Sequence, residues 1–199
     1  MPASLSTLME EGRRAVLRPL AQASTLPPGF YTSPEIFEAE RERVFRRNWV
    51  SVGRASEIPQ PGDRFRIDVA GEPLMIVRGK DARIRALSAV CRHRWMLLGE
   101  GAESAGTIAC PYHKWTYALD GALMAAPLMD KAEGFERDAC ALPSFACEVW
   151  NGFIFVNLGG DAEPLAQALA PLAAEFAPWK MDELEIAGRV EFDQPYNWK

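Results

Sequence analysis

Both histidines of this 199-residue sequence closely follow a cysteine, and these two pairs are the residues best suited to chemistry. Cys91 and His93 have one residue between them, and Cys110 and His113 have two. Thiolates and imidazoles are ligands of zinc and of iron–sulfur clusters. The pairs therefore predict a metal centre with these four residues as ligands, either one tetrahedral zinc ion or a two-iron cluster.

The spacing favours the cluster. Zinc fingers usually separate paired ligands by two or more residues so that both side chains reach one ion, whereas a single residue separates Cys91 from His93. On an extended loop, such a pair can place its two ligand atoms on adjacent metals. Sixteen residues lie between His93 and Cys110, which allows a second, opposing loop. Each loop would then give its thiolate to one iron and its imidazole to the other.

The remaining cysteines, Cys140 and Cys147, have no histidine left over with which to complete another metal site. Thiols of cytosolic proteins usually stay reduced and pack as small apolar side chains. We therefore interpret both as core residues rather than as metal ligands or a disulfide.

Three basic and two aromatic residues flank the ligands. Arg92, Arg94 and Lys114 could dock an acidic electron donor or form a solvated rim, and the sequence leaves both interpretations open. Tyr112 and Trp115 are expected to shield the centre from water rather than to take part in its chemistry.

The elements that must position the ligands are predicted to form a small antiparallel β domain over about residues 49–158. Short runs of β-forming residues alternate with turn sequences such as Pro61-Gly62-Asp63 and Asp120-Gly121. The predicted strands are Trp49–Gly53, Phe65–Val69, Leu74–Arg78, Ile84–Ser88, Thr107–Ala109, Thr116–Leu119 and Phe153–Asn157.

Residues 1–48 are predicted to form an N-terminal arm and one helix. Residues 1–32 end in Leu26-Pro27-Pro28-Gly29-Phe30, which is typical of an arm that lies over another part of the protein. Ser33-Pro34-Glu35 then combines an N-cap, a proline at the first helical position and an acid in the first turn. The helix should run for about three turns, to the Arg46-Arg47 pair.

Residues 159–199 are interpreted as a helical linker and the first strand of a catalytic domain that is absent from this chain. The composition predicts short helices over Glu163–Ala170 and Pro171–Phe176. Leu184–Asp193 alternates as a strand does, yet it has no evident partner. An unpaired strand near the end predicts that a second domain follows.

Composition limits the possible classes of protein. Hydrophobic residues make up 48% of the chain and charged residues 25%, as in ordinary globular proteins. The net charge of −5 gives no electrostatic reason to expect nucleic acid binding. No apolar stretch is long enough to span a membrane, and acids and arginines interrupt residues 1–25. We therefore expect a cytoplasmic protein without a secretory signal or membrane contact.

The segments Cys91-Arg92-His93-Arg94 and Cys110-Pro111-Tyr112-His113-Lys114-Trp115 resemble the paired motif of Rieske [2Fe–2S] domains. The resemblance implies a small antiparallel β-sandwich with two cluster-binding β-hairpin loops, the cysteines on the inner iron and the histidines on the outer iron. Respiratory Rieske proteins carry an extra cysteine in each loop and a serine after the second histidine, where this sequence has Tyr112 and Trp115. The chain is more similar to the N-terminal domain of Rieske non-haem iron oxygenase α subunits, of the aromatic-ring-hydroxylating dioxygenase type.

The resemblance covers nearly the whole chain, because it includes Ser33–Trp49, the run from Glu57 to Asp63 and the final Asn197-Trp198-Lys199. It departs at Trp95, where many relatives have a small residue, and this puts the packing around the first loop in question. The scarcity of hydroxyl donors beside the ligands implies a reduction potential in the lower part of the Rieske range.

The resemblance implies that the chain transfers electrons within an oxygenase component that hydroxylates or demethylates an organic substrate with O2. A ferredoxin or flavin reductase would supply the electrons, and the full-length protein would be a homotrimer. The family binds a mononuclear non-haem Fe(II) through two histidines and a carboxylate in the catalytic domain. Both histidines of this chain are already used, so we predict that it is inactive alone.

Two other functions remain open on the sequence. A stand-alone Rieske-type ferredoxin would carry electrons between separate proteins, although such a carrier needs neither the arm nor the last predicted strand. A zinc-stabilised β domain used for binding would be colourless, whereas a Rieske centre is brown.

Overall fold

The computed structural model describes residues 4–99, 103–129 and 131–199. The chain divides into two compact units, one formed by Arg46–Ala187 and the other by Met1–Phe45 together with Gly188–Lys199. The larger unit contains the four predicted ligands.

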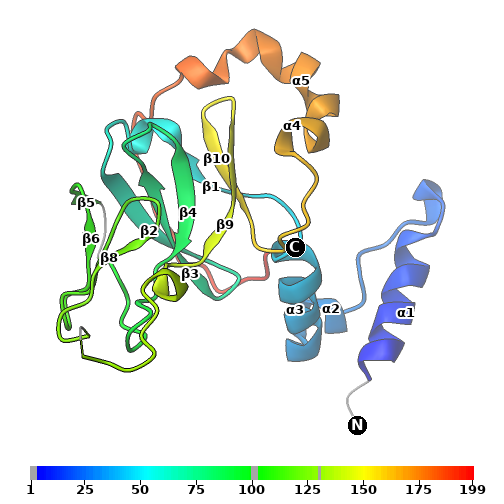
Figure 1. Ribbon diagram of the computed structural model, residues 1–199. Helices are drawn as coiled ribbons and strands as arrows, with labels where there is room; N and C mark the ends of the chain where they lie inside the picture. Colours follow the sequence, from blue (N-terminus) through cyan, green and yellow to red (C-terminus); the bar gives the residue numbers. More distant parts are fainter. Residues whose placement is uncertain (1–3, 100–102, 130) are drawn as a thin grey trace. The chain divides into compact units, whose positions relative to one another are not determined.

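The larger unit is built from two antiparallel sheets (Figure 1). Seven strands pair in the order β1-β10-β9-β4-β3-β2-β5, and three pair in the order β6-β7-β8. The strands are β1 Val50–Arg54, β2 Asp63–Val69, β3 Glu72–Arg78, β4 Ile84–Ser88, β5 Glu103–Ser104, β6 Ile108–Ala109, β7 Thr116–Tyr117, β8 Leu123–Ala125, β9 Ser144–Trp150 and β10 Phe153–Asn157. The predicted fold, mainly antiparallel β with flanking helices, is confirmed.

Each predicted strand of the β domain is confirmed, and β4 and β10 have the predicted bounds. The turn at Asp120-Gly121 also forms, with Gly121 at a φ of 93° that favours glycine. Strands β5, β8 and β9 were not predicted from the sequence. The central strand β9 carries small side chains at Ser144 and Ala146, so its pattern is weak, and pairing with β4 and β10 decides its conformation.

Two apolar clusters fill the larger unit. One surrounds the predicted ligands Cys91 and Cys110 and includes Trp115 and Tyr117, and the other lies between β1, β3, β4 and β10. Cys140 packs against the first cluster and Cys147 against the second. Both thiols are free, and burial raises the pKa of Cys147 to about 12, so that thiol stays protonated. The interpretation of both cysteines as core residues is confirmed.

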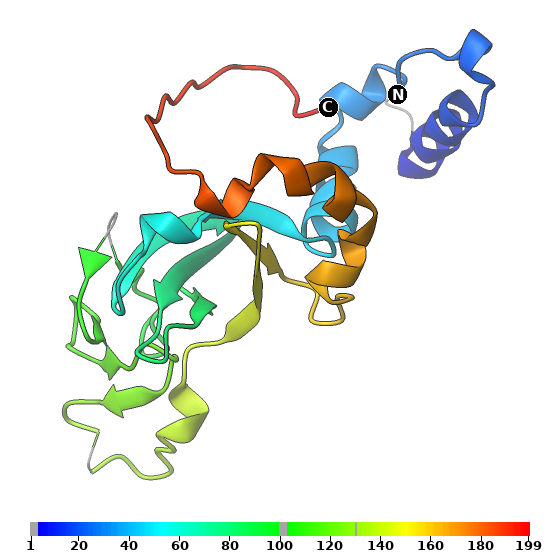
Figure 2. The ribbon, with the colours of Figure 1, turned by 90° about the horizontal axis from the view of Figure 1, so that it is seen from above.

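The two predicted helices that follow the sheet are confirmed as α4 Leu165–Ala168 and α5 Ala170–Phe176, followed by the 3-10 turns η5 Ala177–Trp179 and η6 Met181–Glu183. This segment runs beside the β1 and β10 edge of the sheet (Figure 2). Arg54 of β1 is 8% exposed, and its guanidinium donates to the carbonyl oxygens of Met181 and Leu184 at 2.6 and 2.8 Å. The same guanidinium lies 4.5 Å from the ring centre of Phe153. Arg54 therefore fastens the end of the helical segment to the sheet.

The strand predicted over Leu184–Asp193 does not form, and this prediction is corrected. Ile186, Val190 and Phe192 are exposed. A strand needs a neighbour to satisfy its backbone donors and acceptors, and no strand of the described ranges pairs with this segment. Alternation of apolar and polar residues was therefore not sufficient to predict a strand in this segment.

The smaller unit is helical, with α1 Leu5–Val16, η1 Leu20–Gln22, α2 Gly29–Thr32, α3 Pro34–Glu40 and the π-helical turn η2 Arg41–Phe45. Ser33 caps α3 as predicted, since its hydroxyl accepts the N–H of Ile36 at 3.3 Å. The arm predicted over residues 1–32 instead contains α1. Ser4 caps this helix, and Glu10 pairs with Arg13 and Arg14 one turn later.

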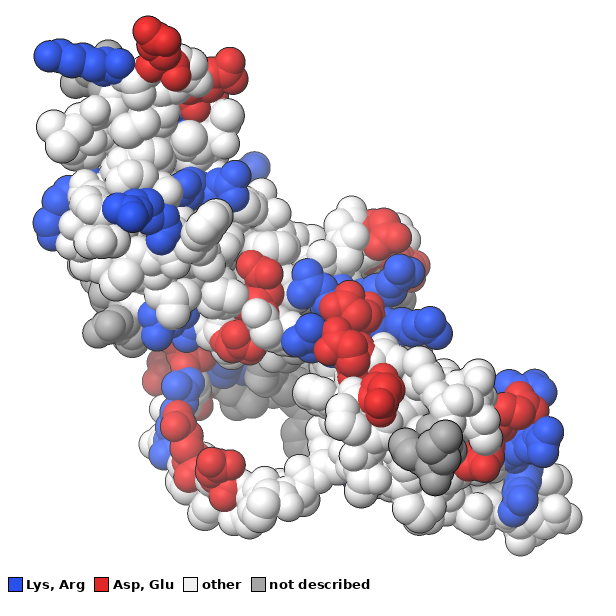
Figure 3. Space-filling model, turned by 90° about the horizontal axis from the view of Figure 1, so that it is seen from below, with Lys and Arg blue, Asp and Glu red and all other residues white. Residues whose placement is uncertain are grey.

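Charges of both signs are distributed over the surface. Figure 3 shows one face on which acidic and basic side chains stand in small groups separated by uncharged residues, consistent with the modest net charge of −5. Across the described residues, no helix has both the length and the apolar character that crossing a membrane requires.

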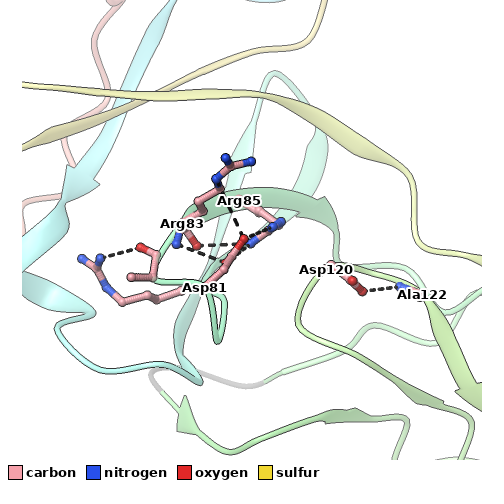
Figure 4. Close-up of polar contacts among 7 residues, drawn as sticks. Asp81, Arg83, Arg85, Asp120 and Ala122 are labelled. Atoms are coloured by element: carbon pink, nitrogen blue, oxygen red, sulfur yellow. Dashed lines mark hydrogen bonds and ion pairs between the residues drawn. The ribbon is translucent and has the colours of Figure 1, made fainter.

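An ion pair holds the turn between β3 and β4 (Figure 4). Both oxygens of Asp81 accept hydrogen bonds from the guanidinium of Arg85, at 2.8 and 2.7 Å, and Asp81 also accepts the backbone N–H of Arg83. Asp120, on the neighbouring turn, bonds instead to the N–H of Ala122. The Arg85 guanidinium holds the pKa of Asp81 well below its usual value.

Asp81→Asn is therefore expected to lower stability by the same amount at every pH from 5 to 8. A depressed pKa contributes stability above the unfolded-state pKa of about 3.9, and that contribution is lost only as the pH falls through the folded-state value. Urea unfolding at three pH values checks this. Asp120→Asn is the control, since an amide oxygen can still accept the Ala122 N–H. A difference that shrinks between pH 8 and pH 5 would contradict the assignment.

Candidate metal centre

The two loops that carry the predicted ligands share one backbone pattern. In each, the cysteine carbonyl accepts the N–H of the fourth residue after it, and the cysteine N–H donates to the carbonyl of the fifth. The pairs are Cys91–Trp95 at 3.0 Å, Cys91–Met96 at 2.9 Å, Cys110–Lys114 at 3.0 Å and Cys110–Trp115 at 2.8 Å. A bridge between Val90 and Leu97 closes the first loop, and pairing of β6 with β7 closes the second. Both predicted hairpin loops are therefore present and equivalent.

The loops bring all four predicted ligands together. Cys91 and Cys110 are 1% and 2% exposed, and both side chains belong to the same buried apolar cluster. The rings of His93 and His113 are half-buried, with their centres 4.8 Å apart. The cysteines thus form the inner part of the site and the histidines its outer part.

Unpartnered atoms show what this site could hold. Nδ1 of His93 and Nδ1 of His113 are both buried and have no hydrogen-bond partner in the described part of the chain. Leaving a buried polar atom unpaired costs about 1–3 kcal/mol, whereas a bond to a metal satisfies it. Within the described ranges, no three His, Cys, Asp or Glu side chains are grouped closely enough to hold a single metal ion together. Two thiols and two free imidazole nitrogens fit a two-iron cluster that takes two protein ligands per iron.

The environment of the ligands favours the protonation states that metal binding needs. Burial lowers the pKa of His93, and the neighbouring His113 and Arg94 add to the shift, so the neutral ring is preferred. Burial raises the pKa of the Cys91 thiol, while the hydroxyl of Tyr117 opposes that shift. A bound metal would remove the thiol proton outright.

Tyr117 is a site residue that the sequence analysis missed. Its side chain is fully buried, and its hydroxyl oxygen lies 3.2 Å from Sγ of Cys91 and accepts the N–H of Arg92 at 3.0 Å. Burial raises the pKa of Tyr117, so the hydroxyl keeps the proton that it can donate to the sulfur. This contact corrects the expectation of few hydroxyl donors near the ligands. Inward alternation of Trp115, Tyr117 and Leu119 was the signal that could have revealed it.

Tyr117→Phe is expected to lower the reduction potential of the loaded protein. A hydrogen bond to a thiolate ligand is stronger when the cluster carries an additional electron, so its loss disfavours reduction. We expect a shift of about tenfold in the reduction equilibrium, or about 59 mV for one electron. Protein-film voltammetry measures it, with Tyr196→Phe as the control because that side chain is 79% exposed and belongs to neither loop. An unchanged potential in the Tyr117 variant would contradict the prediction.

Aromatic rings cover the histidines. Trp115 is 3% exposed and stacks on His93, with ring centres 4.7 Å apart and planes 5° apart. Tyr112 packs against His113 at 3.7 Å but stays largely exposed. Trp115 therefore shields the centre as predicted, whereas Tyr112 covers only one edge of it. Arg92, Arg94 and Lys114 are exposed in the same loops.

Trp95 lies outside this packing. Its side chain is 81% exposed, and its backbone has a φ of 54°, in the left-handed region that Lys114 also adopts in the second loop, at 61°. A large residue is therefore accommodated in the first loop without packing inside it, because the Trp95 indole points into solvent. Only the backbone at this position is constrained.

Trp95→Gly is expected to stabilise the protein by about 0.5–1 kcal/mol. Glycine removes a left-handed strain of about 1–2 kcal/mol and loses about 0.4–1 kcal/mol through the freer unfolded chain. Denaturant unfolding of the loaded protein measures the change. Lys114→Gly is the matched variant in the other loop and should gain a similar amount. A loss above about 1 kcal/mol would show that the Trp95 side chain makes contacts that matter.

Comparison with known proteins identifies the domain in which these residues lie. Residues 48–146 match the family described as the Rieske [2Fe-2S] domain. The carnitine monooxygenase oxygenase subunit of Acinetobacter baumannii is 37% identical over 180 residues, which are 89% of this chain and 48% of that protein. The glycine betaine monooxygenase oxygenase subunit of Chromohalobacter salexigens is 35% identical over 176 residues, 88% of this chain and 39% of that protein.

Solved structures of oxygenases are also similar to this chain. The crystal structure of the quaternary ammonium Rieske monooxygenase CntA superposes with a TM-score of 0.84 and 36% identity, covering 88% of this chain and 52% of that one. Naphthalene 1,2-dioxygenase from Rhodococcus sp. is more distant, with a TM-score of 0.74 and 27% identity over 84% of this chain and 38% of that one. The chain spans about half of the length of the Acinetobacter oxygenase subunit and of CntA.

Proposed function

From the premise that residues 48–146 of this chain belong to the Rieske [2Fe–2S] family, we propose that the chain transfers electrons within an oxygenase subunit. The ligands of the cluster are Cys91, His93, Cys110 and His113. The observation that carries this assignment is the pair of buried, unpartnered Nδ1 atoms in a site that also holds two buried thiols of one apolar cluster.

The residues of this chain prepare the site for that task. When bound, a Rieske cluster takes up and releases one electron. The buried cysteines keep water from the inner part of the site, and the Tyr117 hydroxyl, 3.2 Å from Sγ of Cys91, would donate a hydrogen bond to that sulfur once it is a thiolate ligand. The half-buried histidines form the outer part, so their edges are the shortest route by which an electron can leave. Trp115 excludes water from one face of His93.

The proposal extends to the substrate class. We place the parent oxygenase among those that act on quaternary ammonium compounds of the carnitine and glycine betaine type, rather than among aromatic-ring dioxygenases. Support comes from 37% and 35% identity to two such oxygenase subunits and from the higher TM-score of CntA. The expected reaction type is then monooxygenation, and hydroxylation of an aromatic ring is the less supported alternative.

The remaining parts of the proposal concern organisation and partners. Residues 49–158 would be the Rieske domain, residues 1–48 its N-terminal arm and helices, and residues 159–199 a linker to a catalytic domain that binds the mononuclear iron. A ferredoxin or flavin reductase would supply electrons to a homotrimer. A cytoplasmic location suits four free cysteines, because thiols stay reduced there.

Anaerobic reconstitution tests the core of the proposal. The chain should bind about two iron and two sulfide per molecule and accept about one electron per cluster from a flavin reductase. Protein with one zinc and no labile sulfide would overturn it. Delivery of that electron to a separate, unrelated oxygenase at a catalytic rate would instead support a stand-alone ferredoxin.

The substrate class needs its own test. A chimera that joins this chain to the catalytic domain of the Acinetobacter carnitine monooxygenase should oxidise carnitine when it receives reductase and O2. A chimera with the catalytic domain of naphthalene 1,2-dioxygenase is the matched comparison. Coupled turnover only in the second chimera would contradict the proposed class.

A further inference from the structure

Trp115 carries a polar atom that the chain leaves without a partner. Its side chain is 3% exposed, and Nε1 is buried with no hydrogen-bond partner among the described residues. An indole N–H is only a donor, so it cannot bind a metal as the two histidine nitrogens can. Burying such a donor without an acceptor is destabilising. The site therefore has room for an acceptor that none of the described residues supplies.

The position of Trp115 limits where that acceptor lies. One face of the indole stacks on His93, and the backbone carbonyl of Trp115 accepts the N–H of Cys110. The side chain belongs to the same buried cluster as Cys91 and Cys110, yet neither thiol accepts a hydrogen bond from Nε1. Phe135 approaches at 5.7 Å with its plane inclined by 68°, and it offers only the weak acceptor of an aromatic face.

We infer that the indole N–H of Trp115 donates a hydrogen bond to an inorganic sulfide of the cluster. The inference rests on the proposed function, because it requires the cluster to be bound. None of the described protein groups accepts a hydrogen bond from Nε1, and a sulfide of the cluster is an acceptor that enters the site together with the iron. The flat contact with His93 adds a second role, since it fixes the plane of that ligand ring. Trp115 is in this sense a positioning residue.

The bond has a measurable effect on the redox equilibrium. A donor to a sulfide stabilises the reduced cluster, which carries one more negative charge, more than the oxidised cluster. Trp115→Phe keeps an aromatic ring beside His93 and removes the N–H. We expect the reduction equilibrium to shift about tenfold toward the oxidised form, which is about 59 mV for one electron. Trp150→Phe is the control, since Trp150 packs on Phe176 and belongs to neither loop.

A direct test detects the nitrogen itself. Protein grown with tryptophan labelled with nitrogen-15 at the indole position is loaded with the cluster, reduced and examined by pulsed electron paramagnetic resonance. A nitrogen-15 coupling is expected in the wild type, in Trp95→Phe and in Trp150→Phe, and it should vanish in Trp115→Phe. Exchange into deuterium oxide should add a deuterium coupling that is lost in the same variant.

The outcomes of these measurements either support or overturn the hydrogen bond from Trp115 to the sulfide. A loaded wild type without a nitrogen-15 coupling overturns the inference, as does a coupling that disappears in Trp95→Phe. An unchanged potential in Trp115→Phe also overturns it. If Trp115→Phe does not bind the cluster, the wild type, Trp95→Phe and Trp150→Phe still decide through their couplings. Absence of iron and labile sulfide from the wild type would instead refute the proposed function, so the two failures are distinguishable.

Discussion

Replacing any one of Cys91, His93, Cys110 or His113 with alanine is expected to remove the cluster and the brown colour. Each iron would have only two protein ligands, so one substitution leaves an iron with a single protein bond. Iron and labile sulfide should fall from about two of each per chain to nearly none. The hairpins should also lose stability, because metal binding and folding are coupled. Metal analysis, visible absorbance and thermal unfolding measure these effects.

The other two cysteines provide the control for this experiment. Cys140→Ala and Cys147→Ala remove a thiol of the same size from the same unit, but they leave the predicted ligand set intact. Both variants should retain iron and sulfide at the wild-type ratio. Retention of a complete cluster in the His93 or His113 variant would contradict the ligand assignment.

Residues 1–199 are expected to accept electrons and yet to form no oxygenated product. Activation of O2 by non-haem Fe(II) uses an iron held by two histidines and a carboxylate with open positions. The sequence contains two histidines, and the proposal commits both to the cluster. Chemical reduction should bleach the protein, air should reoxidise it, and neither carnitine, glycine betaine nor naphthalene should be converted. Mass spectrometry of the reaction mixtures measures this.

A complete carnitine monooxygenase supplied with the same reductase is the positive control for that experiment. Stoichiometric product from residues 1–199 with added iron would show that the active site has been misplaced. Such a result would also mean that at least one of the two histidines binds a mononuclear iron instead of the cluster.

Local sequence was sufficient where local physics dominates. Ser33 and Pro34 mark the start of α3 through capping and a fixed φ, and the β-branched and apolar runs at Ile84–Ser88 and Phe153–Asn157 form strands with those bounds. The proposed ligands could be selected from the sequence because few residue types bind metals and the spacing of these four is restrictive. The loops then bring them together as expected.

Features that depend on distant contacts were not predictable. Tyr117 lies 26 residues from Cys91, so its hydrogen bond to that thiol follows from the way the two hairpins oppose each other. Alternation over Leu184–Asp193 predicted a strand, but a strand forms only where a neighbour completes its hydrogen bonds. Helix α1 was not predicted, because the prolines at the end of residues 1–32 indicated an extended arm. The pairs of Glu10 with Arg13 and Arg14, which stabilise the helix, were not considered.

Because the two loops oppose each other, the proposed cluster would also be a covalent cross-link between the two hairpins. Because each iron would take one ligand from each hairpin, the centre ties residue 91 to residue 110 as a disulfide would. Chain-entropy arguments give a tie that closes a loop of about 20 residues a stabilisation of about 3 kcal/mol, through the freedom that it removes from the unfolded chain. This contribution depends only on the span of the tie. An inert metal bridge between the same two hairpins would supply it equally, without carrying any electron.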